Sequence, residues 1–145
     1  MELDTLLAQR EIEYKLIAFA RAMDARDWPA IEALTTADFC ADFGLGEIQG
    51  RALVIQNMRS YLDHCGVTQH LLGNILVNVE GDLATSHAYV ADMHLAAEAT
   101  QELSFRTLGD YTDTWRKVDG AWLMTRREKD NRALIGSMDV FKPPA

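Results

Sequence analysis

The first third of the chain has apolar side chains at helical spacing. Between residues 5 and 25 they recur at steps of three and four, which predicts an amphipathic helix with one buried stripe. Asp27 followed by Trp28 and Pro29 is typical of a capped helix start, so a short second helix is expected to reach Leu34. The expected buried stripe of the first helix is Ile12, Leu16, Phe19, Ala20 and Met23.

A second clear amphipathic helix is expected over residues 51–63, ending near Gly66. Residues 38–43 read as a strand that is broken at Gly44 and Gly46. The expected core positions of the helix are Leu53, Val54, Met58 and Leu62.

From Thr68 onward the pattern changes to long runs rich in branched and aromatic residues, over 69–79, 83–97, 103–118 and 121–129. Gly81-Asp82 and Asp119-Gly120 separate two pairs of these runs, and Asp-Gly between strand-like segments is a strong hairpin signal. A polar tip at 99–102 separates the middle pair. Helices followed by strands predict an α+β fold, with helices packed on one face of a curved, mainly antiparallel sheet. The tail is expected to form one short turn before Pro143-Pro144.

The 145 residues fit a single domain over residues 1–145, with a core of about 5–131. Lys plus Arg number 14 and Asp plus Glu number 22, so the formal net charge of −8 argues against nucleic-acid or anionic-lipid partners. No apolar run approaches the roughly 20 residues of a membrane span, and the N-terminus lacks signal-peptide features, so a cytoplasmic location is expected. Cys40 and Cys65 form no C-x-x-C pair, which argues against a disulfide framework or zinc knuckle.

Three polar residues stand out on otherwise apolar elements. Asp24 falls at the edge of the first helix's stripe, near Ile17, His70 opens a strand, and His94 lies on the next strand. A carboxylate that binds one ring nitrogen of a histidine fixes its orientation and stabilises the imidazolium, so the other nitrogen can act as a base. The hypothesis is that His70 removes a proton, Asp24 orients it, and His94 delivers a proton to, or bonds, a leaving oxygen.

Each of these residues also has a plainer interpretation. Asp24 could be solvated or help to cap the next helix, His70 could be structural, and His94 could be half-exposed. Two histidines and a carboxylate could also bind iron or zinc as a facial triad, but the chain has no local metal signature, so neither metal nor cofactor is predicted. For other residues the simpler interpretation is structural: His64 and His87 as surface or packing residues, Tyr111 as core, and Arg126-Arg127 with Glu128 as a strand surface with paired charges.

Three segments carry a family resemblance. Residues 23–28 (Met-Asp-Ala-Arg-Asp-Trp), 68–74 (Thr-Gln-His-Leu-Leu-Gly-Asn) and 115–122 (Trp-Arg-Lys-Val-Asp-Gly-Ala-Trp) resemble the SnoaL-like, nuclear-transport-factor-2-like superfamily. The resemblance covers about residues 12–129. It implies a cone-shaped α+β half-barrel in which helices close one side of a bent sheet around a pocket.

Within the superfamily the motifs look closest to those of scytalone dehydratases. Asp24, His70 and His94 match an aspartate just before Lys-Asp-Trp, a histidine within Thr-Gln-His, and a second histidine on the following strand. Dehydrochlorinases that act on hexachlorocyclohexane are similar at Asp24 and His70. The dehydratases hold a water against the substrate carbonyl with two tyrosines, but this chain has Met23 and Phe43 at those positions, which cannot donate a hydrogen bond.

Another side chain must therefore supply the missing donor, and Tyr61, Asn74 and Tyr111 are the candidates. Together with Met23 and Phe43 they form the expected substrate-binding set. The resemblance implies a cofactor-independent, dehydratase-like lyase that acts on a small cyclic or aromatic metabolite through an Asp–His general base. An isomerase or hydrolase-type modifier with the same base stays open, as does a non-catalytic ligand-binding or oxygenase-small-subunit-like domain.

The resemblance also implies a homo-oligomer, a dimer or trimer formed through the outer face of the sheet. It further implies that the C-terminal tail, residues 132–145, closes the pocket as a lid.

Overall fold

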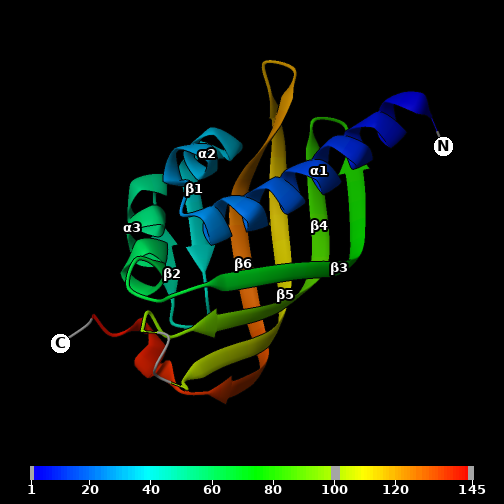
Figure 1. Cartoon of the computed structure of the whole chain (residues 1–145). Helices are drawn as coiled ribbons and strands as arrows, with labels where there is room; N and C mark the ends of the chain where they lie inside the picture. The colour runs from blue at the N-terminus through cyan, green and yellow to red at the C-terminus, as the bar shows by residue number, and fades with distance from the viewer. Residues whose placement is uncertain (1, 99–101, 144–145) are drawn as a thin grey trace.

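A computed structural model of the chain describes residues 2–98 and 102–143. Three helices, six strands and a terminal 3₁₀ turn are arranged as helices on one side of a single sheet (Figure 1). In chain order the elements are α1 (Leu3–Ala25), α2 (Trp28–Leu34), β1 (Thr35–Asp42), β2 (Glu47–Gln49), α3 (Arg51–Leu62), β3 (Thr68–Glu80), β4 (Leu83–Leu95), β5 (Ser104–Val118), β6 (Ala121–Gly136) and η1 (Met138–Phe141).

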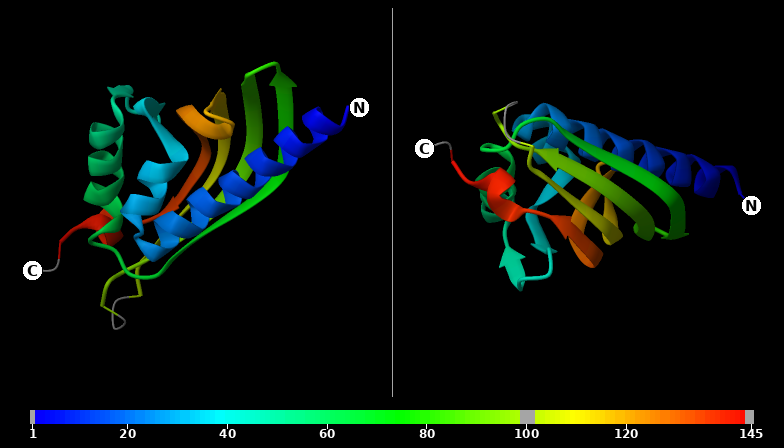
Figure 2. Two further views of the ribbon diagram at one scale, coloured as in Figure 1. Left: turned by 90° about the horizontal axis from the view of Figure 1, so that it is seen from above. Right: turned by 60° about the horizontal axis from the view of Figure 1, so that its bottom comes forward.

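The sheet has the strand order β2-β1-β6-β5-β4-β3. Every neighbouring pair is antiparallel except β1 and β6, which are parallel. The strands curve around one side, where α1 crosses the sheet and α2 and α3 stand beside β1 (Figure 1, Figure 2). The sheet does not close into a barrel, since β2 and β3 remain its edges. The predicted α+β, cone-shaped half-barrel is confirmed.

The helices form where the apolar spacing predicts them. All five expected stripe residues of α1 are buried, and α1 ends at Arg26 in a left-handed conformation, with φ of 56°. Asp27 caps α2 by accepting a hydrogen bond from the backbone N–H of Ala30, as expected. In α3 the buried positions are Val54, Met58 and Leu62, a strict four-residue repeat. Leu53 lies about 100° away from that stripe and is 56% exposed, so its predicted core position was wrong.

Two strand boundaries differ from the sequence-based expectation. The glycine-rich turn at Gly44–Gly46 leads into the short strand β2, which pairs with β1. Strand β6 continues well past Lys129, because it pairs along the full length of β5 as far as Gly136 opposite Phe105. The expected single turn of the tail is η1, which lies beside α3 and β5 (Figure 2).

Two bulges in β6 decide which of its side chains face inward. Opposite β5, Thr114 pairs with Arg126 but Trp115 pairs with Met124, so Thr125 is an extra residue, and Arg132 is a second one. A bulge of one residue reverses the in–out alternation of the strand beyond it. Trp122 and Met124 are therefore buried before the first bulge, and Arg127 is buried after it.

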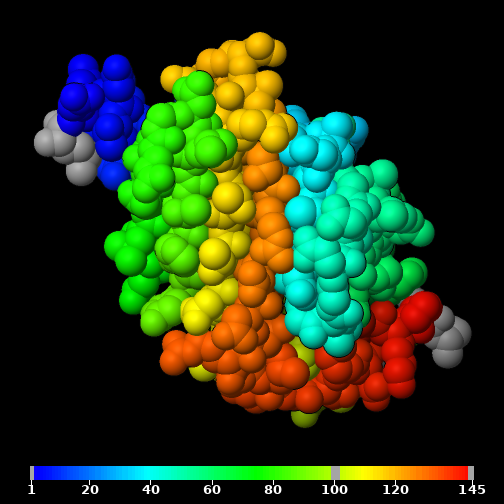
Figure 3. Space-filling model, turned by 180° about the vertical axis from the view of Figure 1, so that it is seen from behind, coloured from blue at the N-terminus to red at the C-terminus, as the bar shows by residue number. Residues whose placement is uncertain are grey.

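The face of the sheet that α1 does not cover is formed by β3 to β6 lying side by side (Figure 3). Several large apolar side chains on these strands are exposed there, among them Leu71, Tyr89 and Leu108. None of the helices within residues 2–98 and 102–143 is long and apolar enough to cross a membrane.

Candidate functional site

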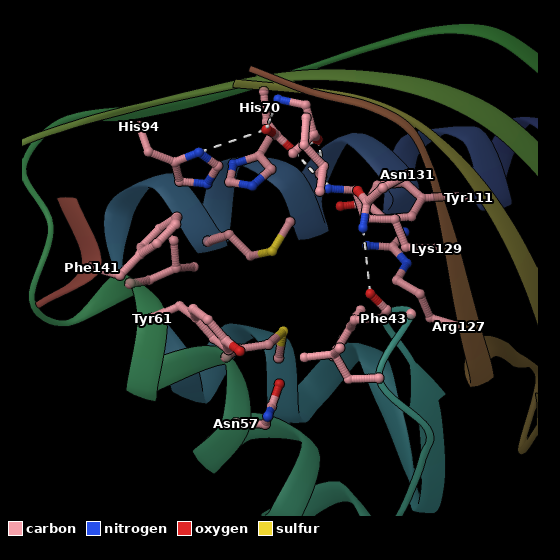
Figure 4. A pocket seen from close by; sticks show the side chains of 18 of the residues that line it. Phe43, Asn57, Tyr61, His70, His94, Tyr111, Arg127, Lys129, Asn131 and Phe141 are labelled. Atoms are coloured by element: carbon pink, nitrogen blue, oxygen red, sulfur yellow. Dashed lines mark hydrogen bonds and ion pairs between the residues drawn. The ribbon is translucent and has the colours of Figure 1, made fainter. Parts of the chain in front are cut away.

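A cavity of about 650 Å³ lies between the inner face of the sheet and the helices. Its walls come from the end of α1, the turn after β1, α3, strands β3 to β6 and η1, so it draws on the whole length of the chain. Figure 4 shows the two histidines on one wall, with Tyr61 and Asn57 of α3 opposite them. The lining side chains include Met23, Phe43, Tyr61, His70, His94, Phe105, Tyr111, Lys129, Asn131 and Phe141.

Asp24 and His70 meet at this wall. The Nδ1 atom of His70 lies 2.7 Å from Oδ1 of Asp24, and the backbone N–H of His70 donates to Oδ2 at 3.0 Å. The hydroxyl of Thr68 also donates to Oδ1, at 2.9 Å. The His70 side chain is 5% exposed and lines the cavity, whereas Asp24 lies behind it. The edge position of Asp24 on α1 is what lets its carboxylate reach the start of β3.

The electrostatics of this pair fix the tautomer of the histidine. Burial alone would raise the pKa of Asp24, but the hydrogen bonds from the His70 ring, the His70 backbone and Thr68 bring that pKa below its usual value. Asp24 is therefore an ionised acceptor, and Nδ1 of His70 carries the proton between them. In the neutral imidazole this leaves the Nε2 lone pair for a molecule in the cavity.

Arg26, which the sequence analysis did not single out, holds this arrangement together. Its guanidinium donates to Oγ1 of Thr68 at 2.7 Å and to the backbone carbonyls of Met23, Leu62 and Gly66 at 2.8–2.9 Å. The hydroxyl of Thr68 then donates to Asp24, so Arg26 links the end of α1 to the start of β3. Nothing in the local charge pattern indicates this role, because all its partners except the backbone carbonyls of Met23 and Asp24 are distant in sequence.

His94 is 6% exposed, so the half-exposed alternative was wrong. Its Nδ1–H donates to the backbone carbonyl of Phe105 at 3.1 Å, and its ring is perpendicular to that of His70 at 5.5 Å. Burial lowers the pKa of His94, and the nearby Asp92 offsets this only in part. The ring is therefore neutral near pH 7 with its lone pair on Nε2. In that state Nε2 of His94 can accept a hydrogen bond from a hydroxyl group, which fits the second of the two roles expected for it, bonding a leaving oxygen.

A second polar cluster lies beside the histidines. The carboxylate of Asp92 accepts from the backbone N–H of Thr107 at 2.9 Å, from the Thr107 hydroxyl at 2.7 Å and from the ammonium of Lys129 at 2.8 Å. Burial would raise the pKa of Asp92, but the charge and hydrogen bond of Lys129 lower it overall, so the carboxylate is ionised. The alternation of β4 puts Asp92 on the same face as His94, a signal that could have revealed it. Lys129 gives no such signal, because its inward position depends on the bulge at Thr125.

His70, Asp92 and His94 are also the residues that could hold a metal ion. One ligand atom of each lies within 4.8 Å of the others. The fit is poor, because both oxygens of Asp92 already accept hydrogen bonds and Lys129 brings a positive charge to the carboxylate. A cation would have to displace Lys129 or Thr107 to reach Asp92.

Four of the five expected substrate-binding residues line the cavity: Met23, Phe43, Tyr61 and Tyr111. Asn74 does not, so it cannot supply the missing donor. It lies exposed in β3 with φ of 51°, where the register against β4 shifts between Gly73 and Leu76. The left-handed conformation suits asparagine, which explains the residue type without a role in binding.

Tyr111 is both a core residue and part of the wall. It is 4% exposed, and burial raises its pKa well above the usual value. The guanidinium of Arg127 lies 3.7 Å from the centre of its ring. Arg127 was expected at the strand surface, which was wrong: it is 1% exposed and donates twice to the buried Asp113, at 2.8 and 3.0 Å. The bulge at Thr125 turns Arg127 inward and leaves Arg126 outside.

The other residues expected at the surface are found there. Arg126 forms ion pairs with Glu47 and Glu128 at 2.9 and 3.1 Å, and His64 and His87 are exposed.

On the inner face, Asn131 donates to the backbone carbonyl of Phe43 at 3.4 Å (Figure 4). Its own side-chain oxygen is buried and has no hydrogen-bond partner among residues 2–98 and 102–143. A hydroxyl group of a bound molecule could satisfy that oxygen.

The C-terminal turn forms one end of the cavity. Phe141 of η1 packs edge-on against the rings of Tyr61, His94 and Phe105, with ring centres 4.9–5.5 Å apart. Met138 of the same turn also lines the cavity. The tail thus occupies the place expected of a lid, and any opening motion stays a prediction. Residues 144–145 of the expected lid, and residues 99–101 of the expected polar tip, lie outside the described residues.

The fold and the cavity can be compared with those of known proteins. An uncharacterised protein of Mycobacterium tuberculosis (strain H37Rv) is 31% identical over 119 residues, which cover 81% of this chain and 80% of the relative. A solved structure from Novosphingobium aromaticivorans, described as a candidate aromatic ring hydroxylase, has a TM-score of 0.82 at 26% identity and covers 94% of this chain and 98% of its own.

Two further structures share the fold at lower identity. A candidate scytalone dehydratase from the same organism has a TM-score of 0.82 at 22% identity, over 92% of this chain and 89% of its own. A type 2 hexachlorocyclohexane dehydrochlorinase has a TM-score of 0.82 at 17% identity, and the match covers 99% of this chain and 98% of its own. The model of the SnoaL-like domain matches residues 4–128. The chain therefore belongs to the SnoaL-like domain family.

Proposed function

We propose that the protein is a cofactor-independent lyase that removes water from a small cyclic or aromatic metabolite, with His70 as the general base and Asp24 as its positioning residue. The observation that carries the proposal is the 2.7 Å contact between Nδ1 of His70 and Asp24 at the wall of a cavity of about 650 Å³. Such a volume suits a ligand of one or two rings.

The reaction needs no group beyond those of the chain and the substrate. Nε2 of His70 removes a proton from a carbon next to a carbonyl group, and the C–H electron pair passes into an enolate. The enolate collapses to form a new C=C bond as the bond from the neighbouring carbon to its hydroxyl group breaks. The departing hydroxide takes the proton from the His70 imidazolium and leaves as water, so the base is restored.

In this proposal His94 has the second of the two roles that the sequence left open, bonding the leaving oxygen. Because its Nε2 is an acceptor, it binds the hydroxyl group that will leave and orients it toward His70, whose ring is 5.5 Å away. The apolar wall, with Met23, Phe43 and Phe141, excludes water and so favours elimination over exchange with solvent.

Known relatives support the reaction class only in general terms. Solved structures with this fold include a candidate scytalone dehydratase and a hexachlorocyclohexane dehydrochlorinase, both named for eliminations. Their identities of 22% and 17% show the fold, and the reaction of this chain rests on its own site.

The experiment is a screen of cyclic 3-hydroxy ketones for loss of water, followed by variants on any substrate found. We expect His70→Gln to lower kcat by about 10²–10⁴-fold and Asp24→Asn to lower it by a smaller factor, since only His70 touches the substrate. The matched control is His87→Gln, which changes an exposed histidine on the outer face and should leave turnover unchanged.

Three results would contradict the proposal. Full turnover in both His70→Gln and Asp24→Asn would remove the base. Tight binding of cyclic ligands without any conversion would favour the non-catalytic, ligand-binding alternative. Loss of turnover after chelation, restored by iron or zinc, would favour a metal at His70, Asp92 and His94.

A further inference from the structure

Lys129 places a positive charge in the wall of the cavity, next to the histidines. Its side chain is 13% exposed and reaches the cavity from β6, on the same wall as Tyr111 and Asn131 in Figure 4. The ammonium donates to Oδ2 of Asp92 and to the hydroxyl of Thr107, both at 2.8 Å. An ammonium has three N–H donors. Across the part of the chain that the structure describes, only these two partners are found, so one donor is available to a molecule in the cavity.

The inner surface of the sheet is shaped to hold the lysine in this position. The Cα of Lys129 is level with Tyr111 on β5, four residues from Thr107, so its side chain must lie along the sheet to reach its partners. It passes over Gly109, where a Cβ atom would come within 2.7 Å of Cε of the lysine. The lysine side chain as placed has no room for a Cβ atom at this position. The φ of Gly109 is not in the left-handed region, so the backbone conformation does not itself require a glycine here.

The lysine and the base lie at the same end of the cavity. His70, Asp92 and Thr107 form one row across β3, β4 and β5, because each is the register partner of the next. The ligand atoms of His70 and Asp92 lie within 4.8 Å of each other, and the ammonium is bonded to that same carboxylate. A base and a cationic hydrogen-bond donor placed side by side suit a proton on carbon and the carbonyl oxygen next to it.

We propose that Lys129 is the group that binds and stabilises the enolate oxygen of the substrate, in place of the tyrosine-held water that Met23 and Phe43 cannot support. As His70 takes the proton, the carbonyl π electrons move onto oxygen, and the third N–H of Lys129 donates to that oxygen. When the hydroxyl group leaves, the same electrons re-form the carbonyl and the hydrogen bond weakens. No proton passes to or from the lysine. The substrate class is therefore a 3-hydroxy ketone or a related compound whose carbonyl oxygen becomes anionic.

This inference rests on the proposed function for the role of His70, but it is tested by binding. The probe is 4-nitrophenol, whose phenolate is an anionic ring oxygen with a distinct absorbance, and nitrobenzene is the neutral analogue of similar shape. We expect the wild-type protein to bind the phenolate about 10–100-fold more tightly than Lys129→Met does, because one hydrogen bond to a charged group strengthens binding by about this factor. Nitrobenzene should bind both proteins equally, and Lys117→Met, which alters an exposed lysine, should match the wild type.

Two further variants keep the test decisive if Lys129→Met does not fold. Lys129→Arg keeps the charge and should retain most of the preference for phenolate. Gly109→Ala leaves the lysine in the sequence but pushes its side chain off the glycine, and should lose the preference. A wild-type protein that binds both probes alike or neither of them, or a Lys129→Met protein with undiminished preference, would overturn the inference. If instead the preference holds while His70→Gln keeps full turnover, the anion site stands and the proposed base fails.

Discussion

His94 couples the stability of the fold to pH. In the folded protein burial lowers its pKa below 6.5, while in the unfolded chain the imidazole has its ordinary pKa. Between those two values the unfolded state binds more protons, so the free energy of unfolding should fall as pH drops below about 6.5 toward the lowered pKa. The slope from this one group is at most about 1.4 kcal/mol per pH unit.

The measurement is urea unfolding of the wild type and of His94→Gln at intervals between pH 5 and 8. Asp92 lies beside His94, and its pKa is held below the usual value by Lys129, so its carboxylate stays ionised over this range. Lys129 and His70 are present in both proteins. The difference in unfolding free energy between the two proteins should therefore be constant toward pH 8 and shrink as the pH falls below about 6.5. A difference that stays constant over the whole range would show that His94 is not held neutral by burial.

At the scale of elements, Arg26 joins α1 to β3 and so sets the position of Asp24. Replacing it with glycine relieves the left-handed conformation at this residue but removes the guanidinium and its hydrogen bonds to Thr68 and three carbonyls. Hydrogen bonds from a charged donor contribute about 1.5–3 kcal/mol each, more than the conformational relief of about 1 kcal/mol. We expect Arg26→Gly to lower the free energy of unfolding by at least about 1 kcal/mol in chemical denaturation.

A lysine at this position is the matched control, because it keeps the charge but can form fewer of these bonds. Arg26→Lys should fall between the wild type and Arg26→Gly. An Arg26→Gly protein as stable as the wild type would mean that α1 is held to β3 by apolar packing alone.

The elements that the sequence located are those that depend on local contacts. The three-and-four spacing of α1, the cap at Asp27 and the Asp119-Gly120 hairpin each rest on residues close in the chain, and each was found in its expected place. The parallel pairing of β1 with β6 joins residues 86 to 89 positions apart in the chain, and no local pattern indicates it.

The same distinction between local and long-range contacts applies to the residues of the site. The resemblance identified His70 and Asp24, and the structure brings them together. Arg127 was expected on the wrong face and Lys129 was missed because the bulge at Thr125 reverses the alternation of β6. A bulge is determined by pairing with the neighbouring strand. Leu53 was misplaced for a simpler reason, since an apolar residue at the edge of a helical stripe can face either way.

At the scale of the whole molecule, the outer face of the sheet carries large apolar side chains that no described element covers. Leu71, Ala91, Leu108 and Ala133 are successive register partners and form one row across β3 to β6, and Leu71 and Leu108 are 66% and 51% exposed. Figure 3 shows these strands side by side without a covering helix. A contiguous apolar patch on a sheet commonly marks a protein interface.

We expect a second copy of the chain to cover this face, as the family resemblance implied. Light scattering after size exclusion should give the mass of a dimer or trimer for the wild type, and Leu108→Glu should give a monomer because a buried carboxylate would lie at the centre of the row. Leu53→Glu changes an exposed leucine on α3, away from the sheet, and should keep the wild-type mass. Because the cavity lies on the opposite side of the sheet, a monomeric Leu108→Glu protein should still bind ligands there. A wild-type protein that is monomeric at all concentrations would contradict the prediction that a second copy covers this row of leucines and alanines.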